Sequence, residues 1–441
     1  STPFRLSLHV GDVGHTLVVG PTGAGKSVLL ALMALQFRRY DRSQIFAFDF
    51  GGSIRASALA MGGDWHDLGG GLTEGSEVSV SLQPLARIDD AYERSWAADW
   101  IAAILMREGM IITPEVKEHI WTALTSLASA PAGERTITGL AVLLQSNDLK
   151  QALRPYCVGG AYGRLLDAEA EHLGSADVQA FEIEGLVGTG AAPAVLAYLF
   201  HRIGDRLDGR PTLLIIDEVQ HLATRKDFET FTATLRTLLQ GAQGLVYAVF
   251  TGSSQHGLAR MFRRSKAPFY QYGSEVSFPD LGMEFAQHLA GMFLKATGRQ
   301  WDAAEAFSLY VRRGMMPKHL REIYNLSLTQ NLSVAEADKI VWASMLDEGQ
   351  FSTLIEGLPP LDQALLVGIL TGESLFSADY RNRLGDGLPS GTAPSSAQVQ
   401  AALKRLQRAE LIGNLEHGTW RIEDGALESF LRRTLLDDEQ D

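Results

Sequence analysis

Eight consecutive residues constrain the fold more than any other part of the chain: Gly20, Pro21, Thr22, Gly23, Ala24, Gly25, Lys26 and Ser27. They match the pattern G-x-x-x-x-G-K-[S/T] in full, between a β-rich apolar run at 15–19 and a helical pattern at 28–39. Backbone N–H groups of such a turn, with the helix N-terminus behind them, hold phosphates. Lys26 is expected to reach the β- and γ-phosphates of ATP, and the Ser27 hydroxyl to ligate Mg²⁺. The sequence therefore predicts an α/β P-loop fold with a parallel sheet.

A pair of acids follows a second buried strand. The run 212–216 reads TLLII and ends at Asp217 and Glu218. A buried parallel strand delivers such a carboxylate to the sheet edge where phosphate and metal bind. Asp217 is therefore expected to complete the Mg²⁺ shell, and Glu218 to activate the attacking water. The alternative is a solvated strand end with no catalytic role.

Two further strand ends carry polar residues, and each leaves two interpretations open. Asp49 ends the run 44–50, so its carboxylate could face the nucleotide or metal, or could cap the loop 51–53. The strand 244–250 runs into Thr251, and Ser253 and Gln255 follow. One of these side chains could sense the γ-phosphate, or their polar atoms could satisfy a local turn.

Basic residues form clusters with alternative roles. Four crowd one segment: Arg260, Arg263, Arg264 and Lys266. They could supply an arginine finger to a neighbouring subunit, or they could be solvated charges; Arg312 and Arg313 are a second candidate pair. No His-Glu-x-x-His or Gly-x-Ser-x-Gly pattern occurs in the sequence, so a zinc enzyme of that type and a serine hydrolase are unsupported.

Apolar periodicity and turn residues divide the 441 residues into five segments. Between the strands 44–50 and 212–216 the pattern predicts a large helical block. The segments are 1–85, the first part of the P-loop core; 86–210, a helical insertion and return to the core; 211–279, the second part of the core; 280–356, a helical lid; and 357–441, a winged-helix domain with an acidic tail.

The last segment raises the question of DNA binding. Its third predicted helix carries Lys404, Arg405 and Arg408, which suit a helix that reads a DNA groove. However, residues 361–441 contain 8 basic and 13 acidic residues, a net charge of 8 − 13 = −5. Contact with protein is therefore favoured, and DNA binding stays open.

Composition limits the cellular setting. The net charge is −13, and no apolar run approaches the roughly 18 residues that span a bilayer. With Cys157 as the single cysteine, an internal disulfide and a Cys-based metal cluster are excluded, which fits a reducing cytoplasm. The chain starts at Ser1 rather than Met and is expected to be trimmed or a fragment of a longer protein.

Residues 2–218 closely resemble the TrbE-type conjugative transfer ATPases of type IV secretion systems. The resemblance rests on 4–27, 46–65, 112–131, 143–156 and 199–218. It implies phosphate binding at 20–27, a Mg²⁺-side acid at Asp217 and a catalytic glutamate at Glu218. It also implies a homo-oligomer, with a hexamer as one form, and secretion-system partners at the cytoplasmic face of the inner membrane.

Residues 219–433 look instead like the second half of an AAA+/STAND ATPase of the archaeal type, followed by a lid and a winged helix. We interpret the layout as a recombined or truncated gene. The leading hypothesis is a secretion motor or assembly ATPase. The alternatives are a slow nucleotide-dependent switch that signals through its winged helix, and a hybrid that binds nucleotide without coupling.

Overall fold

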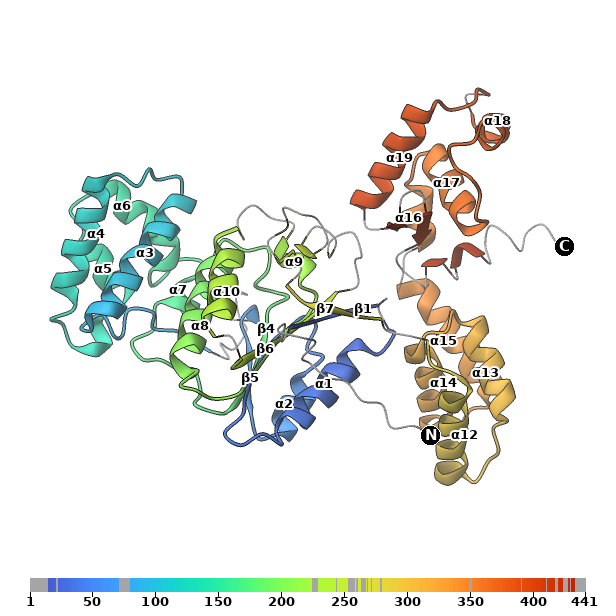
Figure 1. Ribbon diagram of the computed structural model, residues 1–441, viewed down its shortest axis with the longest axis horizontal. Helices are drawn as coiled ribbons and strands as arrows, with labels where there is room; N and C mark the ends of the chain where they lie inside the picture. The colour runs from blue at the N-terminus through green and yellow to red at the C-terminus, as the bar shows by residue number, and fades with distance from the viewer. Residues whose placement is uncertain are drawn as a thin grey trace. The chain divides into compact units, whose positions relative to one another are not determined.

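The computed structural model describes residues 15–20, 23–70, 80–223, 229–242, 244–252, 258, 261–262, 267, 269–270, 272–277, 280–348, 351–389, 391–409, 411–416, 419–422, 427–428 and 430–432. The chain divides into two compact units (Figure 1). The first contains Ser27–Thr251 with short flanking pieces. The second contains Val18–Lys26 and the chain from Glu275 onward. Among the described helices, none has the length and apolar character that a membrane crossing requires.

Among the described residues, seven strands form one sheet in the order β3-β4-β2-β5-β6-β1-β7. Their bounds are His15–Val19 (β1), Gln44–Asp49 (β2), Asp64–Asp67 (β3), Val178–Glu182 (β4), Thr212–Ile216 (β5), Val246–Gly252 (β6) and Ser274–Ser277 (β7). The pairs β3–β4, β4–β2, β2–β5 and β5–β6 are parallel. The predicted α/β fold with a parallel sheet is confirmed.

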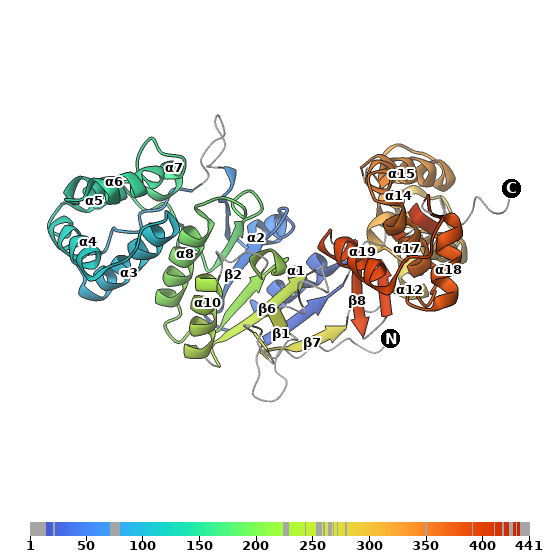
Figure 2. The same ribbon diagram turned by 90° about the horizontal axis from the view of Figure 1, so that it is seen from above.

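Helices cover both faces of the sheet, which explains why β2 and β5 are buried along their whole length. Helices α1 (Lys26–Phe37) and α2 (Arg55–Ala60) lie along one side. Helices α8 (Ala192–Arg206) and α10 (Glu229–Gly241) lie along the other (Figure 2). Phe48 of β2 stacks on Phe200 of α8 with ring centroids 4.7 Å apart, so the sheet and α8 pack directly against each other in the core.

A large helical block was expected between the strands 44–50 and 212–216; the structure has helices there and also two strands that were not predicted. Strands β3 and β4 fall inside this stretch and join the sheet beside β2. Their sequences, DWHD and VQAFE, mix polar with apolar residues and form no aliphatic run. In addition, β1 and β2 do not pair, because β5 and β6 lie between them in the sheet.

The helices of the block are α3 (Ala91–Arg107), α4 (Pro114–Leu127), α5 (Ile137–Leu143), α6 (Asn147–Leu153) and α7 (Gly163–Leu166), with short 3₁₀ turns at Ala132–Glu134 and Arg154–Tyr156. Side-chain caps define the starts of several of them. The Asp90 carboxylate accepts from the N–H groups of Tyr92 and Glu93, and Thr113 caps α4 in the same way. The Trp100 indole N–H donates to the Ala194 carbonyl at 2.9 Å, which attaches α3 to α8.

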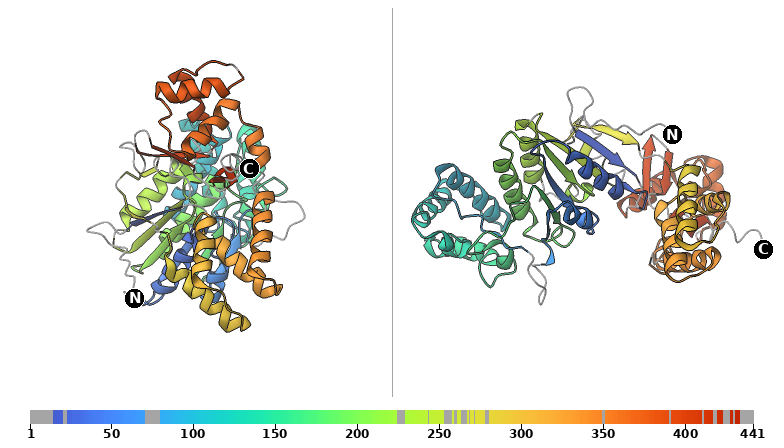
Figure 3. Two further views of the ribbon diagram at one scale, coloured as in Figure 1. Left: turned by 90° about the vertical axis from the view of Figure 1, so that its right-hand side faces the viewer. Right: turned by 90° about the horizontal axis from the view of Figure 1, so that it is seen from below.

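In the second unit, a four-helix bundle consists of α12 (Met283–Thr297), α13 (Ala303–Arg312), α14 (Pro317–Thr329) and α15 (Val334–Glu348) (Figure 3). Its core includes Phe293, Leu309 and Ile323. This bundle corresponds to the segment expected to be a lid.

The C-terminal module contains α16 (Phe351–Glu356), α17 (Pro360–Leu370), α18 (Ala378–Gly387), α19 (Ser396–Arg408) and the antiparallel hairpin of β8 (Ile412–Glu416) and β9 (Thr419–Ile422). Phe351 and Ile355 of α16 share its core, ahead of the expected boundary at 357. Three helices followed by a hairpin are the elements that predict a winged helix, and that assignment stays a prediction.

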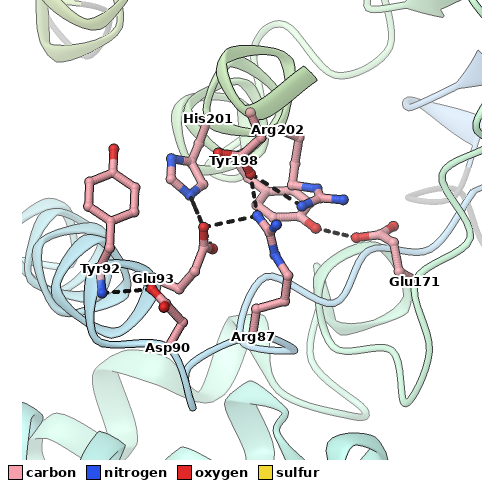
Figure 4. A network of polar contacts seen from close by, with 9 residues as sticks. Arg87, Asp90, Tyr92, Glu93, Glu171, Tyr198, His201 and Arg202 are labelled. Atoms are coloured by element: carbon pink, nitrogen blue, oxygen red, sulfur yellow. Dashed lines mark hydrogen bonds and ion pairs between the residues drawn. The ribbon is translucent and has the colours of Figure 1, made fainter. Parts of the chain in front are cut away.

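A polar network joins the helical block of the first unit to α8 (Figure 4). Arg87 donates to Glu93 at 3.0 Å and to Asp205. Glu93 in turn contacts the His201 imidazole at 3.2 Å, and His201 stacks on Trp96 with ring centroids 4.0 Å apart. The ligand atoms of Glu93, His201 and Asp205 lie within 4.8 Å of one another, as metal ligands would. Because the Arg87 guanidinium contacts both carboxylates, we interpret the group as a salt-bridge network.

Candidate functional site

The P-loop segment follows β1, and α1 begins at its lysine. Lys26 is 6% exposed, and its ammonium donates to the Gly20 carbonyl at 2.8 Å. Gly23 and Gly25 have φ angles of 84° and 102°, a region that side chains with a Cβ rarely adopt. These glycines therefore explain how the loop turns back on itself between strand and helix. Pro21 and Thr22 lie outside the described residues.

The start of α14 contacts this loop within the second unit. The Lys318 N–H donates to the Gly23 carbonyl at 3.3 Å. A Cβ placed on Gly23 would meet the Lys318 Cβ at 3.4 Å, at the near limit of ordinary van der Waals contact. Gly23 is therefore needed first for its backbone conformation, and it also lies directly against the lid bundle.

The predicted acids Asp217 and Glu218 sit at the end of β5, beside the end of β6. Thr251 donates its hydroxyl proton to Asp217 Oδ1 and accepts from the Glu218 N–H at 3.3 Å. The Val219 N–H donates to the Thr251 carbonyl at 2.9 Å. These hydrogen bonds fix the turn to β6 through both backbone and side-chain atoms, and the Asp217 side chain is buried. Glu218 itself has a φ of 44°, in the left-handed region.

The hydroxyl of Thr251 has two hydrogen-bond partners within its own site. The sequence left open a γ-phosphate sensor or a hydroxyl that satisfies local groups. The hydroxyl bonds the Asp217 carboxylate and the Glu218 N–H. Thr251 also belongs to β6 itself rather than to a following turn. The neighbouring candidates Ser253 and Gln255 lie outside the described residues.

Asp49 caps its own loop, which was one of the two interpretations of this residue. Ser53 donates its hydroxyl to Asp49 Oδ1 at 2.6 Å, and the Ile54 N–H donates to Oδ2 at 2.7 Å. The side chain is fully buried. Both oxygens thus stabilise the turn from β2 into α2.

A pocket of about 680 Å³ opens at the carboxyl ends of β2, β3 and β4. Its lining includes Trp65, Asp67, Glu182 and Glu184. Glu182 accepts from the N–H groups of Gly52 and, at 2.8 Å, of Glu184. Burial nevertheless raises the pKa of Glu182, against the lowering effect of these hydrogen bonds. No sequence signal led to Glu182, because β4 lacks an aliphatic run.

The arginine candidates divide into two groups. The first cluster, Arg260, Arg263, Arg264 and Lys266, lies outside the described residues. In the second pair, Arg313 forms a two-pronged ion pair with Asp338, at 2.8 and 2.7 Å, and its guanidinium lies over the Trp342 ring. These contacts favour a structural role for Arg313 in the lid bundle.

Arg405 is one of the three cations that suit a DNA-reading helix, although contact with protein was favoured for this segment, and its contacts argue against a DNA-reading role. It pairs with the buried carboxylate of Asp362, at 3.0 and 2.5 Å, and so joins α19 to α17. Lys404 and Arg408, the other two basic residues named for this helix, remain exposed.

Comparison with known proteins identifies relatives that match between about half and two thirds of the chain. No family model matches it. A probable conjugal transfer protein TrbE of Sinorhizobium fredii is 47% identical over 220 residues, which are 49% of this chain and 33% of that protein. About half of the chain is TrbE-like. The chain thus covers about a third of this TrbE relative's length.

The relatedness also extends to VirB4. "Protein virB4" of Rhizobium radiobacter is 30% identical over 315 residues, 68% of this chain and 38% of that protein. This match is longer than 2–218, so similarity to secretion ATPases is not confined to the TrbE-like half. These relatives favour the secretion ATPase over the switch. Among solved structures, a Walker-type ATPase of Pyrococcus abyssi has a TM-score of 0.48 and 15% identity, covering 95% of this chain and 91% of that one.

Proposed function

We propose that this chain binds ATP, hydrolyses it with Mg²⁺, and serves as a motor or assembly ATPase of a conjugative type IV secretion apparatus. The observation that carries the proposal is the complete P-loop, whose lysine is buried at the start of α1. The TrbE-like identity of 47% supports the assignment to conjugation.

Phosphate binding falls to the P-loop and the first turn of α1. The positive φ angles of Gly23 and Gly25 let the loop backbone turn, so that its N–H groups can face a bound phosphate. The Lys26 ammonium donates to the Gly20 carbonyl at 2.8 Å. In the bound state its ammonium holds the β- and γ-phosphates, and the Ser27 hydroxyl is a metal ligand.

The acids of β5 provide the remaining chemistry. Asp217 is the metal-side carboxylate, and Thr251 fixes its orientation. Bound Mg²⁺ would offset the negative charge of the phosphate oxygens. Glu218 takes the proton of a water whose oxygen bonds to the γ-phosphorus, while the bond from that phosphorus to the leaving oxygen of ADP breaks.

Assembly and location complete the proposal. The active form is a homo-oligomer, with a hexamer as one form, in which an arginine from 260–264 enters the neighbour's site. Its partners are secretion-system components at the cytoplasmic face of the inner membrane. The C-terminal module contacts protein, which fits its net charge of −5 over residues 361–441.

The test combines calorimetry with ATP turnover. Lys26→Ala should abolish ATP binding, and Glu218→Gln should retain binding while hydrolysis stops. Lys295→Ala, which removes an exposed lysine of α12, is the matched control and should behave as wild type. Unchanged ATP affinity in Lys26→Ala would overturn the P-loop assignment.

A further inference from the structure

Glu218 is held in an unusual conformation by residues on either side of the turn. Its φ of 44° is unfavourable for a residue with a Cβ, so the surroundings must enforce it. Two backbone bonds do so. The Glu218 N–H is anchored on Thr251 Oγ1 at 3.3 Å, and the Glu218 carbonyl accepts from the His221 N–H at 3.0 Å.

The Glu218 side chain has a specific partner as well. Gln220, the first residue of α9 (Gln220–Ala223), donates from Nε2 to Glu218 Oε2. Gln220 is only 1% exposed. A buried amide has few alternative rotamers, and its bond to a charged acceptor is stronger than one between neutral groups.

The surrounding ring and backbone contacts keep Gln220 in place. The next residue, His221, stacks on Phe50 with ring centroids 4.5 Å apart, and Val219 is fully buried. The amide is therefore attached to a turn that β6 holds on one side and the end of β2 on the other. Neither the P-loop pattern nor the pair of acids predicts such a role for Gln220.

We propose that Gln220 is a positioning residue, whose side-chain amide fixes the rotamer of the Glu218 carboxylate from which the attacking water is activated. The inference rests on the proposed role of Glu218 as the base. A general base must be held within hydrogen-bond reach of its proton, so a carboxylate that samples other rotamers reacts less often.

The test is steady-state ATP turnover of the full chain, with ATP affinity measured by calorimetry. Gln220→Met keeps the side chain's length and removes the donor. It should lower kcat by about 10- to 100-fold, the range for a hydrogen bond to a charged group, with ATP affinity within about twofold of wild type. Gln220→Glu replaces the donor with a repelling carboxylate and should lower kcat at least as far.

Two controls separate positioning from general damage. Gln44 is equally buried, with Nε2 donating to the Arg206 carbonyl and Thr212 Oγ1 at 2.9 Å each, at the opposite end of β2. Gln44→Met should leave kcat unchanged. In a Glu218→Gln background, adding Gln220→Met should not lower the residual rate further, because the carboxylate that Gln220 orients has gone.

The outcomes distinguish the two proposals. If Glu218→Gln hydrolyses ATP at the wild-type rate, the role of Glu218 fails and the inference fails with it. If Glu218→Gln is inactive but both Gln220 variants keep the wild-type kcat, the positioning role alone is overturned. It is also overturned if both Gln220 variants lose ATP affinity as much as kcat, since that is the result of a disrupted fold.

Discussion

Asp49 and Asp217 both end or follow buried parallel strands, yet their carboxylates have different neighbours. Asp49 accepts from Ser53 and Ile54 in its own loop, whereas Asp217 is bonded by the Thr251 hydroxyl. We therefore expect Asp217→Asn to lose the Mg²⁺-dependent part of ATP affinity, because a neutral amide is a poorer magnesium ligand.

Asp49→Asn, in contrast, should keep that Mg²⁺ dependence and lose stability by about 1–2 kcal/mol, since the loop loses one acceptor. Titrations of ATP with and without Mg²⁺, together with urea unfolding of both variants, test the contrast. Equal loss of Mg²⁺ dependence in the two variants would contradict it.

The ion pair of Arg405 and Asp362 gives a second prediction for single residues. Asp362 is 1% exposed, so Arg405→Ala leaves a buried carboxylate without its cation. Because the Arg405 side chain is about half exposed, we expect a loss of roughly 1–3 kcal/mol, less than the ~3–5 kcal/mol for a fully buried pair. Amide exchange across 360–370 and 396–408 measures the loss. Arg408→Ala, an exposed cation one turn away, is the control and should change protection little.

At the scale of elements, the sequence predicted the strongly apolar strands of the large sheet and missed its strands of mixed composition. Strands β2 and β5 read QIFAFD and TLLII and are buried on both faces, which makes them easy to recognise. Strand β4 is just as buried, but its Glu182 accepts hydrogen bonds from residues far away in the sequence, the N–H groups of Gly51, at 3.2 Å, and of Gly52. Only the folded chain supplies those partners, so local pattern alone could not find the strand.

The candidate site shows the same division. The P-loop and the Asp217–Glu218 pair have fixed spacing and could be predicted from sequence. The contacts of Thr251 and Gln220 depend on how β6 and α9 meet the end of β5, and no spacing rule encodes that meeting. A polar residue directly after a buried apolar run was the available signal for Thr251.

The stability of the edge strand β3 should depend on pH through the protonation of His66. Burial lowers the pKa of His66 below its usual 6.5, so the unfolded strand binds a proton more readily than the folded one. Above pH 6.5 His66 is neutral in both states and its burial does not reduce the free energy of unfolding. As the pH falls from 6.5 through the lower folded-state pKa, the unfolded state is protonated first and the free energy of unfolding decreases. At pH 6.0 the loss is at most about 0.8 kcal/mol relative to pH 7.5, from the unfolded-state protonation alone.

Hydrogen exchange of residues 64–68, corrected for intrinsic rates, measures that change. His66→Phe keeps an aromatic ring for stacking on Phe181 and cannot titrate, so its protection should not fall between pH 7.5 and 6.0. An identical fall in the wild type and in His66→Phe would show that another group controls the strand.

At the scale of the whole molecule, the P-loop has close contacts with segments far apart in the sequence. Its Gly20 N–H donates to the Gly252 carbonyl at the end of β6 at 3.5 Å, and its Gly23 carbonyl accepts from Lys318 at 3.3 Å. The lid bundle therefore has a direct backbone link to the phosphate-binding loop.

If the active form is an oligomer with a finger donated in trans, two inactive variants should complement each other. Lys26→Ala loses its own phosphate site but keeps its arginines, and Arg263→Ala keeps the phosphate site but lacks the finger. Random mixing places an intact phosphate site beside an intact finger at about a quarter of the interfaces. Turnover measured with light scattering should therefore reappear on mixing, in proportion to oligomer mass.

Arg260→Ala and Arg264→Ala, tested in the same way, identify which arginine acts. If every mixture stays inactive while a wild-type monomer hydrolyses ATP at full rate, each site is complete within one chain, and the finger in trans is wrong.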